Sequence, residues 1–132
     1  MLAKKIEFKK IDEDNGVLKV FQESEDVPFA VKRVFTVSTK KDSIRGNHAH
    51  KECHQFLICL KGKLKIDFDD GKDKGTEFIE ENNNYGIYIP PLVWASQQSL
   101  KDENILLVIA SDIFIESDYI RNKIAFLDYI KK

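Results

Sequence analysis

The sequence predicts an all-β protein, built as a sandwich or a barrel and followed by one short C-terminal helix. Most of the chain consists of short segments rich in Ile, Val, Tyr and Phe, which fit a pleated and half-buried surface. Turn signals separate these segments, and no long amphipathic helical pattern occurs before residue 117. Strands that follow one another without helices between them exclude a βαβ architecture.

The expected strands follow one another between recognisable turns. The first comes after Asp14-Asn15-Gly16, and Lys61-Gly62-Lys63 joins two later strands as a hairpin. The stretch DDGKDKG (69–75) is expected to be a loop. In order, the strands are VLKVF (17–21), VKRVFTV (31–37), HQFLICL (54–60), LKIDF (64–68), EFIEE (77–81), YGIYIP (85–90) and ILLVIAS (105–111).

The last segment, residues 117–132, has a different pattern. Apolar residues recur at Ile120, Ile124 and Leu127, and Ser117 is a suitable helix N-cap. Phe126 and Ile130 lie close to this apolar stripe, which we expect to pack on the barrel as core. We therefore expect one helix over the whole segment.

Composition places the chain among single-domain proteins. Its 132 residues are 42% hydrophobic, enough for one core, so residues 1–132 are expected to form a single domain. The net charge of −1 argues against nucleic-acid binding through a basic face. No apolar run approaches the ~20 residues that span a bilayer, and the N-terminus lacks a signal peptide. We expect a cytoplasmic protein without a membrane partner.

The two cysteines fit a reducing environment. Cys53 and Cys59 are six positions apart in what reads as one strand, which separates them by roughly 20 Å at ~3.3 Å per residue. A disulfide needs alpha carbons within about 7 Å. We expect both cysteines to be free thiols.

The stretch RGNHAHKECHQ (45–55) contains all three histidines of the chain: His48, His50 and His54. Alternate residues of a strand face the same side, so a regular strand would aim all three at the barrel interior. Buried ring nitrogens need partners, which makes them costly as core residues. A functional site is therefore favoured over the alternative of a solvated loop.

Imidazoles are common ligands for zinc, iron, copper and nickel. The pattern G-x-H-x-H-x-x-x-H from Gly46 resembles the first motif of the cupin superfamily, with His54 in the place of the usual glutamate ligand. The second cupin motif supplies a further histidine, but the matching stretch PPLVWA ends at Ala95, whose methyl group cannot coordinate a metal. Three protein ligands suffice for an open catalytic site, so a metal-dependent cupin enzyme is an alternative.

The chain more closely resembles the nucleotide-sugar 3,4-ketoisomerases that act on dTDP-4-keto-6-deoxyglucose. The combination of R-G-x-H-A-H-K with S-D-Y-I-R near the end is more specific than a generic cupin motif. The resemblance implies a cupin jelly-roll β-barrel, a homodimer, and catalysis without a metal or any other cofactor. The matching stretches cover most of the chain: VPFAVKRVF (27–35), RGNHAHK (45–51), LICLKGKLKIDFDDG (57–71), GIYIPPLVW (86–94) and ASDIFIESDYIR (110–121).

The implied reaction moves a ketone from C4 to C3 of the sugar. It requires removal of the C3 proton, acidified by the neighbouring carbonyl, and protonation of the resulting enediol at C4. Neutral imidazole, with a pKa near ~6.5, suits both steps. By resemblance, His48 is expected to be the base and His50 to assist it. The product would supply 3-amino-3,6-dideoxyhexoses for bacterial surface glycans.

Cations are expected to bind the diphosphate of the substrate, and aromatic side chains to line the sugar or stack on thymine. Arg45 and Arg33 suit the phosphate oxygens, because a guanidinium forms paired hydrogen bonds. Tyr88 and Trp94 are aromatic candidates beside Phe35.

Some positions depart from the family pattern. Phe35 stands where tyrosine is frequent, and Ala95 where a polar residue is frequent. His54 and Val17 also lie at variable positions, and all four are expected to line the sugar. They bear on the configuration at C4, for which we favour the galactose form of the product over the glucose form. A sugar-binding cupin without turnover is the remaining alternative.

Overall fold

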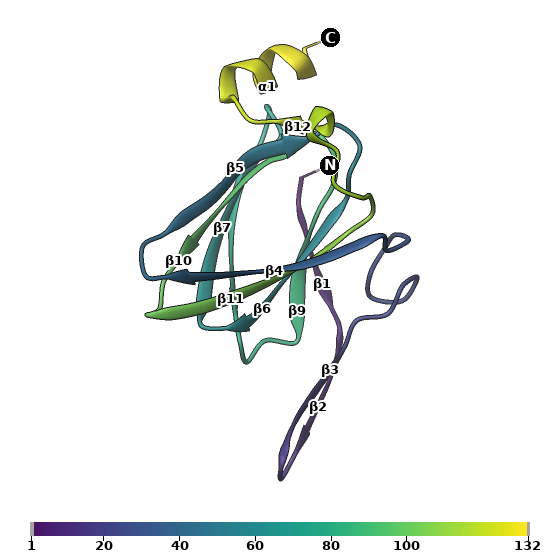
Figure 1. Cartoon of the computed structure of the whole chain (residues 1–132), viewed down its shortest axis with the longest axis vertical. Helices are drawn as coiled ribbons and strands as arrows, with labels where there is room; N and C mark the ends of the chain where they lie inside the picture. The colour runs from purple at the N-terminus through teal and green to yellow at the C-terminus, as the bar shows by residue number, and fades with distance from the viewer. Residues whose placement is uncertain (1, 132) are drawn as a thin grey trace.

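The computed structural model describes residues 2–131 and confirms the all-β prediction: two five-stranded antiparallel sheets face each other as a cupin jelly-roll barrel (Figure 1). The strands of the first sheet lie in the order β1 (Lys4–Glu7), β9 (Tyr85–Ile89), β6 (Gln55–Lys61), β11 (Glu103–Ala110) and β4 (Arg33–Lys40). Those of the second lie in the order β12 (Tyr119–Ile120), β5 (Ile44–His50), β10 (Trp94–Ser99), β7 (Lys63–Asp69) and β8 (Lys74–Glu80).

The barrel interior is apolar because alternate residues of both sheets point inward. Leu57, Ile87 and Val108 come from the first sheet and pack on Ile66 and Phe68 of the second. The edge strand β4 shows the alternation plainly, since its odd-numbered residues are partly buried and its even-numbered residues are exposed. The predicted hairpin at Lys61–Lys63 also forms, joining β6 to β7.

Strand β6 is buried on both faces over its first five residues. Its outward residues Phe56 and Ile58 are covered by N-terminal segments that contribute Phe8, Val27 and Phe29. The N-terminal third of the chain therefore adds a second core on the outside of the first sheet.

The C-terminal segment departs from the prediction of one continuous helix. Helix α1 covers only Lys123–Ile130, and its N-cap is Asn122, whose side chain accepts a 2.9 Å hydrogen bond from the Ala125 N–H. Ser117 lies instead in a 3₁₀ turn (Glu116–Asp118), and the next two residues form β12, which pairs with β5. Backbone pairing with a sheet edge thus replaces the first helical turns.

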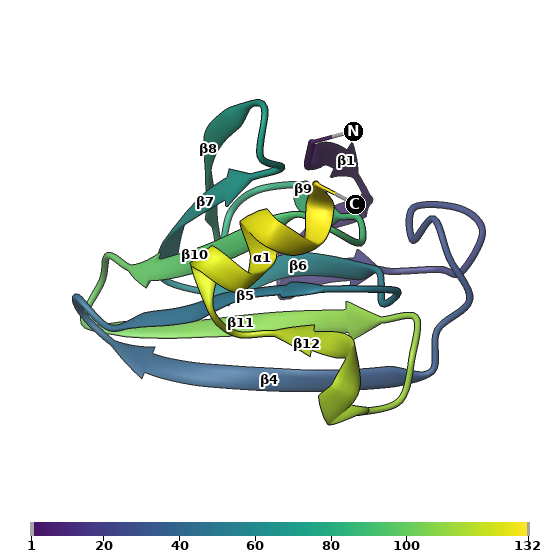
Figure 2. The same cartoon turned by 90° about the horizontal axis from the view of Figure 1, so that it is seen from above.

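The helix covers the outer face of the second sheet (Figure 2). Phe126 is fully buried there against Ala49 and packs beside Trp94. Ile124 is 71% exposed, so this member of the predicted apolar stripe is not core. Phe126 is the buried residue of the face that packs, and Leu127 and Ile130 of the predicted stripe pack beside it.

A hairpin of β2 (Lys9–Glu13) and β3 (Gly16–Val20) projects from the barrel and pairs with no other strand of residues 2–131 (Figure 1). Val17, at 56% exposure, and Leu18 lie on it. An isolated two-stranded hairpin is marginally stable in water, so these apolar residues are suited to contact another surface.

Within residues 2–131, no helix has the length and apolar character needed to cross a membrane. Cys53 and Cys59 are both free and buried, as expected, although Cys53 precedes β6 and so does not share its strand.

Candidate active site

An irregularity in β5 turns its two histidines into the barrel. Gly46 and Asn47 both have positive φ angles (86° and 55°), and the pairing with β10 slips at this point. His48 pairs with Ala95, a residue of the interior core, and directly opposed residues face the same side. His48 and His50 therefore point inward, whereas Ala49 between them packs outward on the helix.

The expectation that all three histidines share one side is wrong, because β5 ends at His50 and the chain turns before β6. His54 lies on the outer face of the first sheet. Its Nδ1 is 2.6 Å from the hydroxyl of Tyr88, and the two rings are stacked beside Phe29. His54 and Tyr88 consequently belong to the outer core and not to the interior site.

Asp118 fixes the orientation of His50. The 3₁₀ turn places its carboxylate 2.9 Å from His50 Nδ1, and the same carboxylate accepts a 2.7 Å hydrogen bond from the Glu52 N–H. A carboxylate accepts hydrogen bonds, so Nδ1 carries the proton and Nε2 of neutral His50 has a free lone pair. His50 is only 4% exposed, and its buried Nε2 has no hydrogen-bond partner in the part of the chain that the structure describes.

The electrostatics of this pair favour neutral imidazole beside ionised carboxylate. Burial lowers the pKa of His50, against the opposing effect of Asp118. Burial by itself would raise the pKa of Asp118, but the hydrogen bonds from His50 and from the Glu52 N–H outweigh it and leave that pKa below its usual value.

His48 is also held neutral. Burial, followed by the proximity of His50, lowers the pKa of His48 to about 4, and a hydrogen bond to the backbone of Gly46 partly opposes this shift. The rings of His48 and His50 meet edge to face, with centroids 5.0 Å apart. Two neutral imidazoles side by side are able to accept protons near pH 7.

Tyr119 closes this group and connects it to Arg33. Its ring lies 5.1 Å from His48 and 4.3 Å from His50, between centroids. Its hydroxyl accepts a long hydrogen bond, 3.4 Å, from Arg33 Nη2. The guanidinium of Arg33 also lies over the rings of Phe35 and Phe114, and its Nε is buried without a partner. The positively charged Arg33 thus lies beside the histidines, and its Nε–H is available to donate a hydrogen bond to a ligand.

The remaining predicted residues fall on different sides of the barrel. Along β5, Arg45 lies before the irregularity and His48 lies after it. Arg45 is the strand partner of Gln97 and lines a small cavity there with Thr39. Ala95 faces the interior beside His48. Trp94 points the other way, against Phe126 and Lys123, so it packs under the helix and does not line the interior.

The residues present do not fit the metal site of cupins. Of the four expected ligand positions, His54 lies on the outer face and Ala95 offers no donor atom. His48 and His50 are the two that remain, short of the three protein ligands of an open catalytic zinc site.

Sequence reasoning missed the residues that come from the C-terminal segment. Asp118 orients His50, Tyr119 contacts both histidines, and Arg121 lies 4.2 Å over the Tyr119 ring while it pairs with Glu116. The motif S-D-Y-I-R contained the signal. In the helix expected over residues 117–132, these residues would not come together beside His48 and His50.

Comparisons with known proteins give a family match and a curated relative. Residues 1–131 match the protein family described as "FdtA: WxcM-like, C-terminal". The TDP-4-oxo-6-deoxy-alpha-D-glucose-3,4-oxoisomerase of Aneurinibacillus thermoaerophilus is 38% identical over 133 residues, which cover 100% of this chain and 95% of that protein.

Solved structures with the same fold include two sugar 3,4-ketoisomerases. QdtA from Thermoanaerobacterium thermosaccharolyticum, solved in complex with TDP, has a TM-score of 0.91 and 37% identity, over 98% of this chain and 94% of that one. A 3,4-ketoisomerase from Helicobacter canadensis has a TM-score of 0.92 and 31% identity, over 98% of both chains.

Proposed function

We propose that this chain, which belongs to the FdtA family of sugar 3,4-ketoisomerases, converts TDP-4-keto-6-deoxy-D-glucose to a TDP-3-keto-6-deoxyhexose. The observation that carries the proposal is the pair of neutral, inward-facing histidines, His48 and His50, with Asp118 behind the second. The names of the relatives support the substrate class. The chain is accordingly an isomerase.

In the proposed reaction His48 takes the proton from C3. The electron pair of the broken C–H bond forms a C3–C4 double bond, and the C4 carbonyl oxygen receives a proton to give the enediol. The C3 hydroxyl then loses its proton, C4 gains one, and the ketone stands at C3. No atom or electron is gained or lost overall, so the chemistry needs proton carriers and no cofactor.

His50 is proposed to transfer protons to and from the oxygens of the enediol. Its Nε2 is an acceptor because Asp118 holds the proton on Nδ1, so it can take the hydroxyl proton and return it. Tyr119 lies against both imidazoles, and its hydroxyl, close to Arg33, is a further donor for the developing oxyanion.

Arg33 and Arg45 are proposed to bind the negative charges of the substrate. The unpartnered Nε of Arg33 supports contact with a substrate oxygen, because a buried donor without a partner carries a desolvation cost that a ligand removes. Arg45 is three residues before His48 and on the same side of β5, so it suits the diphosphate of a sugar whose C3 lies at His48.

The galactose form is the proposed product. In 4-keto-6-deoxy-D-glucose, the C3 proton lies on one face of the ring, and delivery of a solvent-exchangeable proton to C4 on that same face gives the galactose configuration. Both histidines come from one strand, which supports transfer on one face. Phe35, from the facing sheet, and Ala95 provide no proton donor for the other face.

The chain is also proposed to act as a homodimer that supplies an aminotransferase step toward 3-amino-3,6-dideoxyhexoses. The projecting β2–β3 hairpin supports the dimer, since its apolar residues need a partner surface. Val17 lies on that hairpin, so a contact between Val17 and the sugar would be made in the barrel of the partner subunit. A monomer in sedimentation at assay concentration would contradict this.

The direct test is incubation of the purified protein with TDP-4-keto-6-deoxyglucose in deuterium oxide, followed by NMR. We expect the ketone to move to C3, with deuterium incorporated at C4. Reduction of the product then reports the configuration at C4. Exchange at C5 would indicate an epimerase, and binding without exchange would indicate a sugar-binding protein.

The cofactor expectation is tested with the same assay. Treatment with a chelator should leave turnover undiminished, because His48 and His50 carry the protons of the proposed reaction without a metal. Loss of activity that returns on addition of a metal would contradict the proposal.

A further inference from the structure

We propose that His50, Cys53 and Asp118 form a binding site for Zn²⁺, and that zinc bound there inhibits the isomerase by reversing the tautomer of His50. The inhibition rests on the proposed function, whereas the binding site does not. One ligand atom from each side chain (His50 ring nitrogen, Cys53 Sγ and an Asp118 carboxylate oxygen) lies within 4.8 Å of the others. Imidazole, thiolate and carboxylate are the ligand types that Zn²⁺ prefers.

This group is different from the metal position of cupins. It uses Nδ1 of His50, which points toward Asp118, whereas Nε2 is the nitrogen that has no partner. His48, His54 and Ala95 take no part. The two nitrogens of one imidazole thus face two different sites.

The distances require an adjustment of roughly 1 Å. In a tetrahedral site with bonds of ~2.0–2.3 Å from zinc to nitrogen, oxygen or sulfur, two ligand atoms lie roughly 3.3–3.8 Å apart. The ligand atoms of this group lie within 4.8 Å of one another, so the farthest pair must close by up to roughly 1 Å, while His50 Nδ1 and the carboxylate, at 2.9 Å, must separate by a few tenths of an ångström. A change of one rotamer of Cys53, whose thiol now donates to the His54 carbonyl at 3.4 Å, supplies such a movement.

The charges of the group suit a buried dication. The thiolate of Cys53 and the carboxylate of Asp118 together cancel the charge of Zn²⁺, and the imidazole stays neutral. Zinc binding releases the thiol proton to solvent. The proton on Nδ1 leaves as well, and Nε2 takes up one in its place, so one proton is released overall.

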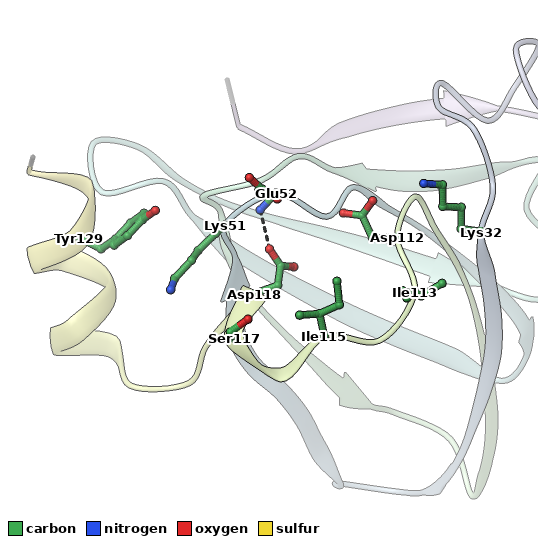
Figure 3. Close-up of a pocket in the computed structure, with 9 residues that line it drawn as sticks. All are labelled: Lys32, Lys51, Glu52, Asp112, Ile113, Ile115, Ser117, Asp118 and Tyr129. Carbon is green, nitrogen blue, oxygen red and sulfur yellow. Dashed lines mark hydrogen bonds between the residues drawn. The ribbon is translucent and has the colours of Figure 1, made fainter.

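An open cavity gives the ion a route that avoids the barrel interior. It has a volume of about 640 Å³, and Asp118, Glu52, Lys51 and Ser117 are among the residues that line it (Figure 3). Asp118 stands at its edge and is linked there to the Glu52 N–H. Water, or the Glu52 carboxylate, can complete a tetrahedral site from this side.

Inhibition follows from the tautomer. Without zinc, Asp118 keeps the proton on Nδ1 and leaves Nε2 as a proton acceptor. With zinc on Nδ1, Nε2 carries the proton and can no longer accept one from the enediol. The pocket for the substrate keeps its shape, so kcat should fall while KM changes little.

Binding is tested with Co²⁺ as a spectroscopic substitute for zinc, added to protein that has been freed of metal by a chelator. We expect a thiolate-to-cobalt charge-transfer band in the near ultraviolet, which zinc abolishes by competition. Cys53→Ser should remove the band and weaken zinc binding at least ~10-fold. Cys53→Ala is a second variant with the same expected result, and circular dichroism checks the fold of each.

Cys59→Ser is the matched control. Cys59 is also a free, buried thiol, but it lies in the interior core, and burial raises its pKa to about 12. This variant should keep both the cobalt band and the zinc affinity. Absence of the band in the wild type, or its persistence in Cys53→Ser, would overturn the site, whatever the activity of the protein.

The inhibitory effect is measured separately, as kcat and KM with increasing zinc. We expect kcat of the wild type and of Cys59→Ser to fall at least ~10-fold at saturating zinc, with Cys53→Ser much less sensitive. If zinc binds through Cys53 but leaves kcat unchanged, the inhibitory part of the inference is wrong. A protein without any isomerase activity would contradict the proposed function and leave the cobalt result valid.

Discussion

His50 and His54 are four residues apart, and Nδ1 of each lies within hydrogen-bond distance of an oxygen from a distant side chain. They nevertheless lie on different sides of the first sheet, His50 in the barrel interior and His54 on the outer face. His50 meets the carboxylate of Asp118, and its other nitrogen is left without a partner in the barrel. His54 meets the hydroxyl of Tyr88 and stacks on it in the outer core. A histidine that stacks in the outer core is thus a packing residue here, and one with an unpartnered nitrogen in the barrel is a candidate for chemistry.

The largest expected effect comes from the interior group. His48→Asn should lower kcat by ~10²–10⁴, because asparagine keeps the size and a hydrogen-bonding group but cannot act as a base near neutral pH. Nucleotide-sugar affinity should be preserved. The measurement is kcat and substrate affinity, with circular dichroism as the control for folding.

His50→Asn belongs to the same experiment and should also impair turnover, with residual exchange at C3 if His48 still removes that proton. Near-normal kcat in His48→Asn beside an inactive His50→Asn would reassign the base to His50.

A smaller loss of kcat is expected when Asp118, which hydrogen-bonds to His50, is replaced. Asp118→Asn leaves the position filled but offers either an amide N–H or an amide oxygen to Nδ1, so the tautomer of His50 is no longer enforced. We expect kcat to fall ~10–100-fold, with little change in KM. Asp112→Asn, at another carboxylate that lines the same cavity, is the matched control and should change neither constant. If KM of Asp118→Asn rises by the same factor as kcat falls, the result would indicate a general structural role.

The outer histidine should matter for stability more than for activity. His54→Asn removes the 2.6 Å hydrogen bond to Tyr88 and the stacked ring, at a cost of about 1 kcal/mol in the free energy of unfolding. Turnover should stay within about twofold of wild type, since general-base catalysis is untouched. Urea denaturation and steady-state kinetics check the two parts. A loss of activity as large as that of His50→Asn would refute the contrast between the two histidines.

The smallest expected effect is the response to acid. The pKa of His48 is lowered to about 4 by burial and then by His50, with Arg121 acting in the same direction and the Gly46 backbone and Glu116 in the opposite one. Its neutral form therefore persists as the pH falls through ~6.5, where ordinary imidazole becomes protonated. We expect kcat/KM to change less than about twofold between pH 7.5 and pH 5.5, measured with a chelator present. A roughly tenfold drop over this range would show that the base titrates like a solvated histidine.

The residues of segments such as VKRVFTV were enough to predict strands, and in the structure β4 alternates between partly buried and exposed residues because a strand repeats every two residues. The same rule failed for His54, since it holds only while the strand continues, and nothing local marked the end of β5 at His50. The helical spacing of apolar residues failed separately for residues 117–120, where Tyr119 and Ile120 pair with β5.

The sequence by itself thus determined the all-β class, the hairpin at Gly62, the free thiols and the inward pair His48 and His50. These features depend on neighbours in the chain, whose spacing and chemistry can be read directly. Only the tertiary structure decided that Asp118 and Tyr119 meet those histidines, that Arg33 reaches the same group, and that His54 does not. Such contacts join residues as many as 86 positions apart, and which strands become neighbours is set by the burial of the whole core.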